Sequence, residues 1–340
     1  MEIIAVDASK YNTHIKLTGH IVQSTIWASF RESKGAETVY LTADEKGKVV
    51  SVWMMYITEI PHTKGKWRIG VISECNSIPK ELVTKLQEIG KEKNLLFIKC
   101  EPLLEDTPAN RKKFTDLGFR KGTDYFLKST FILDITGEKD AIFKKFSSST
   151  RRNIRIAEKK SVYIEIQKYK KGDYTAIDTY LRLLVETKER HQFALHNSAY
   201  FHSMYDILKD TMVILEAKVG SDIVGSMVLF IYNDVCYYPY GASQVERLDT
   251  KAINLLVYES ILYAKEAGCK SFNFWGALPE PADTKHPLYG VHAFKKGYSG
   301  KLYTYIGAYD LVIDEKRYFL FAMVFTLYWK GIKFVRKLKG

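Results

Sequence analysis

Two pairs of segments in this chain align at one and the same spacing. KVVSVWMMYI, which begins at Lys48, matches DIVGSMVLFI, which begins at Asp222, and GKEKNLLFIK from Gly90 matches AKEAGCKSFN from Ala264. Both pairs are 174 positions apart (48 to 222 and 90 to 264). Two different segments that repeat at one offset indicate a duplicated unit, in which a strand pair is followed by a helix that leads into a further strand. Chance similarity between apolar strands is the alternative.

The hydrophobic pattern agrees with an α/β chain. Runs rich in β-branched or aromatic residues and bounded by turn residues predict strands. They are Val49–Ile57, Trp67–Ile72, Leu95–Cys100, Phe131–Ile135, Val162–Tyr169, Met212–Val219, Ile223–Ile231, Val235–Tyr240, Ser271–Trp275 and Leu302–Tyr309. Apolar spacing of three and four predicts helices. They are Glu81–Lys93, Arg111–Leu117, Thr150–Lys160, Tyr174–Gln192, Ala199–Asp210 and Thr250–Ala267. A chain of 340 residues is long for one core, so we expect two domains that join near residues 134–141.

The charge balance and the cysteines narrow the class of protein. The chain holds 51 basic and 39 acidic residues, a net charge of +12, which indicates a polyanionic partner: nucleic acid, a phosphorylated small molecule or an anionic membrane. Its four cysteines are scattered without CxxC spacing, so we expect reduced thiols of a cytosolic protein and no metal site. The longest strongly apolar run, residues 319–329, is too short to span a bilayer.

One stretch gathers basic, aromatic and glycine residues. PLYGVHAFKKGYSGKLY, residues 287–303, places Lys295 and Lys296 next to Gly297. A lysine pair beside a turn marked by glycine can direct ammonium groups into a pocket. A basic β-hairpin on the surface is the alternative, because lysine side chains are mostly exposed.

A second basic stretch predicts a helix with a charged face. SSSTRRNIRIAEKKSV, residues 147–162, begins with serine and threonine residues that favour a helix start. Arg151, Arg155 and Lys159 then fall on one helical face, with Arg152 beside them, at a spacing suited to a row of phosphate contacts. A solvated helix face is the alternative.

This basic segment resembles the TRxNIRxAxKxGV signature of the FemXAB family, the aminoacyltransferases that build peptidoglycan cross-bridges. Further stretches similar to family blocks follow in order within roughly residues 20–312. They are VQSTIWASFRESKG, FIKCEP, LGFRKG, ETKERHQF, YYPYGAS, SFNFWGA and GVHAFKKGYSG, the last of which is similar to GxxxFKxGFGG. The chain departs from the family pattern at Ser29, where some members have lysine, and at Glu101 and Asn273, where aspartate is common.

The resemblance implies two tandem GNAT-like (acyl-CoA N-acyltransferase-like) domains, in agreement with the duplication. It predicts residues 1–136 as domain 1, joined by a returning C-terminal helix over residues 312–340, and residues 137–311 as domain 2. Some members insert a long helical coiled-coil arm in the second domain. Only about fifty residues separate Arg151 from Tyr200, so we expect the α/β fold without this arm.

The resemblance also implies a reaction, in which a primary amine of a peptidoglycan precursor attacks the ester of an aminoacyl-tRNA. The ester is already activated, so no cofactor besides this co-substrate is expected, and the sequence holds no GxSxG or HExxH motif. Such a reaction needs positioning and a stabilised oxyanion. Lys295 matches the family lysine of the FK pair, and the resemblance implies that it binds substrate phosphate and stabilises the developing negative charge. Phe294 would form an apolar wall beside it, and Glu101 would orient the amine or assist its deprotonation.

Other positions are expected to bind the two substrates. The acceptor, a UDP-muropeptide or lipid II, carries a diphosphate, and its candidate partners are Arg31, Arg190, Tyr200, Tyr238 and Tyr240. Tyr238 and Tyr240 lie two apart on a predicted strand and should face the same side. The candidate contacts to aminoacyl-tRNA are Arg151, Arg152, Arg155 and Lys159.

Two functions of other kinds stay open. An acyl-CoA-dependent GNAT enzyme would need a glycine-rich loop that cradles pyrophosphate before a helix. In the corresponding stretch VERLDTKAIN, the position three residues after Arg247 is Thr250 instead of the expected glycine. A non-catalytic RNA-binding protein would explain the net charge and the basic helix, but not the Phe294–Lys295 pair.

The C-terminal stretch FLFAMVFTLYWKGIKFVRKLKG joins apolar residues to a basic tail. It predicts either a core helix with a solvated end or an interfacial helix on an anionic membrane. We expect a cytoplasmic monomer. If the C-terminal helix is interfacial, the protein would also contact the inner face of the cell membrane.

Overall fold

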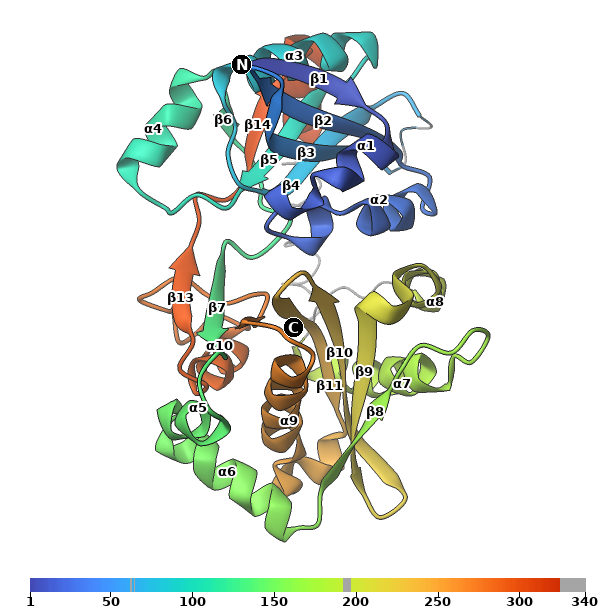
Figure 1. Cartoon of the computed structure of the whole chain (residues 1–340), viewed down its shortest axis with the longest axis vertical. Coiled ribbons are helices and arrows are strands. Elements are labelled where there is room, and N and C mark those ends of the chain that lie inside the picture. The colour runs from blue at the N-terminus through green and yellow to red at the C-terminus, as the bar shows by residue number, and fades with distance from the viewer. Residues whose placement is uncertain (62, 64, 192–196, 325–340) are drawn as a thin grey trace. The chain divides into compact units, whose positions relative to one another are not determined.

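The computed structural model describes residues 1–61, 63, 65–191 and 197–324, and the chain divides into two compact units. Unit 1 comprises Met1–Tyr125 with Ile306–Gly340, and unit 2 comprises Phe126–Tyr305. Each unit contains one seven-stranded sheet with helices packed against it (Figure 1).

The sheet of unit 1 has the strand order β1-β2-β3-β4-β5-β14-β6. The strands are β1 (Glu2–Val6), β2 (Glu37–Glu45), β3 (Lys48–Glu59), β4 (Arg68–Cys75), β5 (Phe97–Pro102), β6 (Arg120–Lys121) and β14 (Tyr309–Val312). The helices are α1 (Ala8–Thr13), α2 (Thr25–Glu32), α3 (Lys80–Glu92) and α4 (Pro108–Asp116). Neighbouring strands are antiparallel except β4 and β5, which are parallel and joined by α3.

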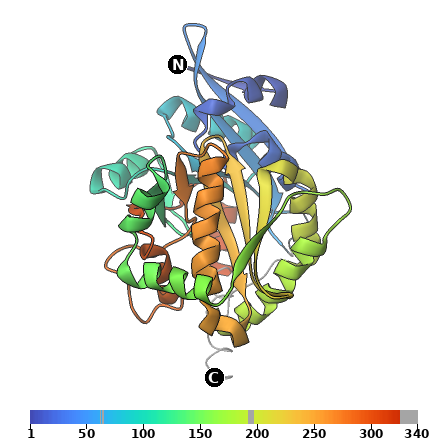
Figure 2. The ribbon, with the colours of Figure 1, turned by 60° about the horizontal axis from the view of Figure 1, so that its bottom comes forward.

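The sheet of unit 2 has the order β13-β7-β12-β11-β10-β9-β8. The strands are β7 (Ser129–Asp134), β8 (Tyr163–Gln167), β9 (Met212–Val219), β10 (Asp222–Tyr232), β11 (Val235–Ser243), β12 (Ser271–Asn273) and β13 (Lys301–Thr304). The helices are α5 (Lys139–Lys145), α6 (Ser148–Lys159), α7 (Thr175–His191), α8 (Ser198–Leu208), α9 (Ala252–Glu266) and α10 (Tyr289–Lys296). Here β11 and β12 are the parallel pair, and α9 joins them in front of the sheet (Figure 2).

The duplication is visible in this topology. The segments that align at an offset of 174 fall on β3 and β10, and on the passages from α3 into β5 and from α9 into β12. In both units an antiparallel hairpin leads into a strand whose parallel neighbour follows one helix. Such a crossover needs a helix to return the chain to the same edge, so the equivalent connections follow from equivalent sequence patterns.

The expected domain boundary is wrong by about ten residues. The expected boundary assigns β7 to domain 1, but β7 pairs with β12 and β13 and therefore belongs to unit 2, which begins at Phe126. The second junction lies after Tyr305, whereas it is expected after Leu311, because β14 pairs with β5 and β6 of unit 1. The single strand expected over Leu302–Tyr309 is thus two strands in different sheets.

Three further expectations concern helices: residues 287–303, the C-terminal segment and the coiled-coil arm. Within residues 287–303, Tyr289–Lys296 form the helix α10, where a glycine-marked turn is expected, and Lys295 and Lys296 lie in its last turn. Residues 315–324 are helical, while residues 325–340 of the expected C-terminal helix lie outside the described residues. Among the residues described, α7 is the longest helix, with 17 residues, so no long coiled-coil arm is present there. None of the helices in these ranges is long and apolar enough to cross a bilayer.

Candidate functional site

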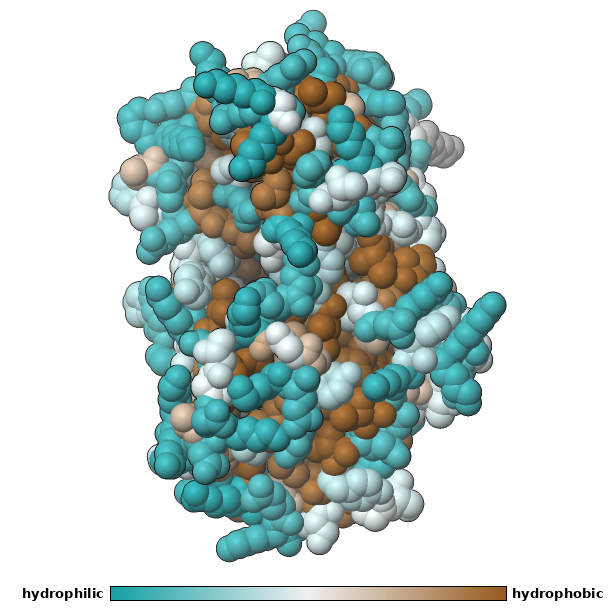
Figure 3. All heavy atoms as spheres, viewed as in Figure 1, coloured by the Kyte–Doolittle hydropathy of each residue, from teal (hydrophilic) through white to brown (hydrophobic). Residues whose placement is uncertain are grey.

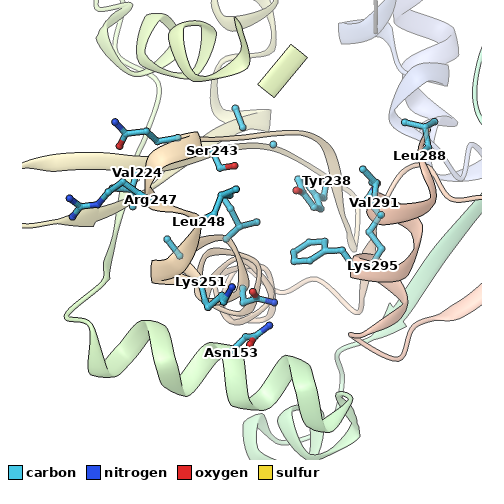
Figure 4. Close-up of a pocket in the computed structure, with 18 of the residues that line it drawn as sticks. Asn153, Val224, Tyr238, Ser243, Arg247, Leu248, Lys251, Leu288, Val291 and Lys295 are labelled. Atoms are coloured by element: carbon cyan, nitrogen blue, oxygen red, sulfur yellow. The ribbon is translucent and has the colours of Figure 1, made fainter. Parts of the chain in front are cut away.

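A pocket of about 590 Å³ opens in unit 2 between the end of β11, the start of α9 and the helix α10. Its wall includes Asn254 and Phe294. Tyr238, Lys251 and Lys295 also line it and are labelled in Figure 4. The sequence predicts Tyr238, Phe294 and Lys295 as site residues, and the fold brings these three together. Lys251 and Asn254 carry no pattern that would mark them in the sequence, because they reach the pocket only through the turn before α9.

Lys295 is buried at this pocket wall, with 8% of its surface exposed. Its Nζ donates hydrogen bonds to the carbonyls of Phe274, at 2.7 Å, and Gly276, at 2.9 Å. The Tyr238 ring centroid lies 5.4 Å away, within reach of a cation–π interaction. Burial lowers the pKa of Lys295 from 10.5 to about 7, because the charged form loses water that these neighbours replace only in part. Two backbone bonds leave one position of the tetrahedral nitrogen for a ligand.

The turn before α9 has already engaged most of its amide groups. Thr250 Oγ1 accepts a hydrogen bond from Ala252 N–H at 3.3 Å, and Asn254 N–H donates to the Lys251 carbonyl at 2.9 Å. Lys251 itself has a φ of 56°, in the left-handed region. A pyrophosphate cradle needs free amides at this helix start, and here at least two of them are satisfied within the chain.

The tyrosines of β11 face opposite sides of the sheet, which corrects the expectation that Tyr238 and Tyr240 share a side. The pairing of β11 with β10 shifts between Val228 and Phe230, so that one extra residue is accommodated in β11. Such a bulge reverses the alternation of side chains. Tyr238 therefore lies on the α9 side beside Lys295, whereas Tyr240 packs on Phe201 with ring centroids 5.4 Å apart.

Tyr200 lies on α8 and belongs to the Tyr240 side of the sheet. Its side chain is hydrogen-bonded to Tyr240, whose pKa is raised by burial and by the neighbouring Tyr200 and Tyr180. The hydroxyl of Tyr180 is buried without a hydrogen-bond partner among the described residues. Arg190 is part of α7, but its side chain lies outside the described residues.

Glu101 is buried in unit 1 at the end of β5, with 6% of its surface exposed. Its two carboxylate oxygens accept hydrogen bonds from Ser73 Oγ and from Tyr125 N–H, each at 2.6 Å. Both donors fix the orientation of the carboxylate, as a positioned acid–base group requires.

A second carboxyl group lies close to Glu101. Glu74 occupies a bulge between Ser73 and Cys75, with a φ of 54°. Burial, and then the charge of Glu101, raises the pKa of Glu74 to about 8. His20 Nε2 lies 3.9 Å from this carboxyl, and burial lowers the pKa of His20 to about 3. At neutral pH both groups are therefore uncharged, and Glu101 stands beside a neutral acid.

Arg31 projects from α2 in the same unit. Its guanidinium carbon lies 4.4 Å from the Tyr56 ring centroid, and its Nε is buried without a hydrogen-bond partner among the described residues. Burial and the nearby Glu101 raise the pKa of Tyr125, while the Arg31 charge opposes them, so both charged groups act on this ring. An unsatisfied guanidinium donor is costly when buried, and an anionic ligand would satisfy it.

The four basic residues expected to contact tRNA from α6 do not all have free side chains. Arg151 bonds to the backbone carbonyls of Lys144 and Phe146, and so caps the end of α5. Arg152, Arg155 and Lys159 are exposed, on a part of unit 2 that is covered by hydrophilic side chains (Figure 3). Within the described residues, no group of three or more His, Cys, Asp or Glu side chains could hold a metal ion.

Comparison with known proteins gives the relatives of this chain. The lipid II:glycine glycyltransferase of Staphylococcus epidermidis is 23% identical over 423 positions, an alignment that covers all of both chains. Because the alignment is 83 positions longer than the 340-residue chain, the relative has segments without a counterpart here.

Solved structures share the fold. A crystal structure of FemX superposes with a TM-score of 0.80 at 20% identity, covering 94% of this chain and 99% of that one. A tandem GNAT protein from the clavulanic acid biosynthesis pathway gives a TM-score of 0.53 at 10% identity, over 92% and 98% of the two chains. The fold is therefore that of two tandem GNAT-like domains.

The profile described as "FemAB family" matches this chain twice, over residues 113–223 and 215–325. The two matches together span more than half of the sequence, and they contain α6, the pocket and Lys295. The chain belongs to the FemAB family.

Proposed function

We propose that this protein transfers an amino acid from aminoacyl-tRNA to the stem-peptide amine of a peptidoglycan precursor, and so builds an interpeptide bridge. The relatives named lipid II:glycine glycyltransferase support this reaction class. The observation that carries the proposal is the buried Lys295, whose Nζ is held by two carbonyls at the wall of a pocket.

The pocket suits the aminoacylated end of a tRNA. It offers an apolar wall at Phe294 and a buried ammonium at Lys295, and Lys251 and Arg247 line it from the α9 side. Arg247 also lies 4.0 Å from the Asp222 carboxylate. Such cations attract terminal phosphates, while the exposed Arg152, Arg155 and Lys159 of α6 would contact the RNA backbone further along.

The chemistry asked of the pocket is aminolysis of an ester. The acceptor amine attacks the ester carbonyl, a C–N bond forms, the C–O bond to the ribose breaks, and the amine's proton passes to the departing ribose oxygen. Charge develops on the carbonyl oxygen in between, and a protonated Lys295 has one N–H left to stabilise it. No protein nucleophile and no cofactor are needed, since the ester supplies the driving force.

Unit 1 offers groups for the acceptor. The free Nε of Arg31 would meet a phosphate oxygen of a UDP-muropeptide or lipid II. Glu101, fixed by Ser73 and Tyr125, would receive a proton from the incoming amine or orient it. In unit 2, Tyr200, Tyr240 and Arg190 remain candidates for contacts to the acceptor.

An acyl-CoA-dependent reaction is the second candidate, and the turn before α9 argues against it. The amides of Ala252 and Asn254 are bonded to Thr250 and Lys251, so they are not available to a pyrophosphate. A purely RNA-binding role leaves the buried, carbonyl-bound Lys295 without a purpose, because burial of a lysine costs free energy.

Contact with an anionic membrane is part of the proposal for a lipid-linked acceptor. Phe319 is 72% exposed on the helix of residues 315–324, and the following sequence is basic. Both features fit a peripheral helix at the cytoplasmic face of the membrane. We expect the enzyme to act there as a monomer.

The decisive experiment incubates the purified protein with radiolabelled aminoacyl-tRNA and with either UDP-muropeptide or lipid II. One arm supplies glycyl-tRNA, because relatives are named glycyltransferases, and two further arms supply alanyl- and seryl-tRNA for comparison. We expect label in the muropeptide amide, abolished when the tRNA is digested beforehand. Transfer of an acetyl group from acetyl-CoA to an amine without tRNA would contradict the proposal and favour the second candidate.

A further inference from the structure

The strand β12 ends in a backbone turn that carries the partners of Lys295. Phe274 N–H bonds to the Phe131 carbonyl and Ala277 N–H to the Ser129 carbonyl of β7, so two residues on one side oppose a single residue on the other. The extra residue is Trp275, with a φ of 68°. Gly276 N–H donates to the Phe274 carbonyl at 3.0 Å, which closes a γ-turn around it.

This turn brings two carbonyls to one lysine. In a regular strand, the carbonyls of residues 274 and 276 would lie along one edge of the strand and bond to its neighbour. The γ-turn at Trp275 lets both reach Lys295 Nζ, at 2.7 and 2.9 Å. A bulky residue with positive φ costs on the order of 1–3 kcal/mol, and it persists only where the surroundings hold it.

Asn273 supplies that hold. Its Oδ1 accepts hydrogen bonds from Trp275 N–H at 2.8 Å and from the Thr130 hydroxyl at 2.7 Å, and the residue is 8% exposed. The Trp275 amide can only donate, so the side-chain atom that meets it must be the oxygen. The tryptophan ring is packed as well, against Tyr237 with centroids 5.8 Å apart.

We propose that Asn273 is a positioning residue of aminoacyl transfer: by bonding to Trp275 N–H it holds the turn whose carbonyls, from Phe274 and Gly276, fix the Lys295 ammonium at the pocket. The inference rests on the proposed function for its kinetic readout. The placing of Lys295 by Asn273 is a property of the folded chain and is measurable without any transfer.

The oxygen is what matters, so the two obvious replacements should differ. Asn273→Asp keeps an acceptor for Trp275 N–H and adds a negative charge behind the turn. Asn273→Leu keeps the branching at Cγ but has no acceptor, so the turn is free to relax and the carbonyls move away from Lys295. Asn273→Asp therefore keeps the Lys295 ammonium in position, and Asn273→Leu does not.

Other titratable groups around Lys295 bear on its proton equilibrium. They are Tyr238 on β11, His292 and Lys296 on α10, Tyr298 after α10 and Lys251 before α9. Burial raises the pKa of both tyrosines, which are neutral near pH 7. His292 and Lys296 both contact Glu280, at 3.2 and 2.6 Å. Burial lowers the Lys295 pKa. A carboxylate introduced by Asn273→Asp should raise it, because a nearby negative charge favours the protonated ammonium.

The experiment titrates Lys295 by NMR in protein labelled at the lysine Cε, with its signal assigned by its loss in Lys295→Met. We expect Asn273→Asp to raise the Lys295 pKa and to move the alkaline limb of the transfer rate to higher pH. Asn273→Leu should change the Lys295 shift and lower kcat by about 10- to 100-fold with little change in KM, as expected for a misplaced group.

A pair of hydroxyl deletions on β7 supplies the matched control. Thr130→Val removes one donor to Asn273 and should perturb the Lys295 titration slightly. Ser129→Ala removes the neighbouring hydroxyl, which bonds to Thr304 at 3.0 Å, and should leave it unchanged. If Asn273→Leu does not fold, the Lys295 titrations of Asn273→Asp and Thr130→Val are compared instead, and they test whether Asn273 positions Lys295.

Unaltered Lys295 titration in both Asn273 variants overturns the inference, and so does an equal loss of kcat in both without a change in the pH profile. Absence of aminoacyl transfer in the wild type would instead contradict the proposed function, while the titrations would still judge the role of Asn273.

Discussion

Replacing Lys295 by methionine should separate catalysis from folding. Methionine keeps an unbranched stem but carries no charge. An ammonium about 4 Å from a developing oxyanion contributes roughly 4 kcal/mol at an effective dielectric constant near 20. This corresponds to a loss of about a thousandfold in kcat. The assay is the transfer of labelled amino acid from tRNA at saturating acceptor.

The same substitution has an effect on stability whose size depends on pH. In the folded protein Lys295 loses its proton near pH 7, whereas in the unfolded chain it keeps it up to about 10.5. Between these values the unfolded state binds more protons, so raising the pH favours the folded state. Relative to Lys295→Met, the wild type should gain about 2 kcal/mol of unfolding free energy between pH 7 and 9.

Urea unfolding at pH 7, 8 and 9, followed by tryptophan fluorescence, measures this difference. Lys296→Met is the matched control: it removes the adjacent lysine, whose side chain is 61% exposed and pairs with Glu280. The control should keep its activity and a stability difference that does not vary with pH. Wild-type turnover in Lys295→Met, or a stability difference between it and the wild type that is the same at all three pH values, would refute the reasoning.

Three further substitutions test the remaining parts of the site. Arg31→Met should raise the KM for a diphosphate-bearing acceptor roughly tenfold and leave kcat near its wild-type value; an unchanged KM would remove Arg31 from acceptor binding. Glu101→Gln keeps an oxygen for Tyr125 N–H, so it should fold normally while kcat drops by about 100-fold if the carboxylate takes a proton; full activity would exclude that role. Gly241→Ala would place a methyl group against the Tyr238 hydroxyl, so it should displace this ring and weaken tRNA-dependent transfer, and a wild-type KM for aminoacyl-tRNA would count against the pocket as the tRNA site.

Much of the fold was predictable because it depends on local patterns. The strand and helix periodicities placed β3, β9, β10, α7 and α9 to within a few residues, and the repeat at 174 positions indicated two copies of one topology. The elements that were missed are short or polar. α10 was not recognised because its eight residues hold glycine and histidine, and its contribution comes from packing against the strands around Phe131.

At the candidate site, the sequence predicted which residues matter but not their surroundings. The motif around Phe294 and Lys295 indicated which lysine to examine. The sequence did not indicate that its ammonium is buried or that Arg151 is occupied by the end of α5. The burial of Lys295 and the contacts of Arg151 both depend on residues that the fold brings close together.

The sequence by itself determined the order of strands and helices, the doubling of the unit and the residue types available for chemistry, because these follow from periodicity and composition along the chain. Only the tertiary structure decided which side of the sheet each tyrosine faces and which backbone atoms hold Lys295. The bulge in β11 and the γ-turn at Trp275 each insert one residue into a strand. Such an insertion reverses side-chain direction or redirects carbonyls, and it is stabilised by pairing partners far away in the sequence, so no local pattern reveals it.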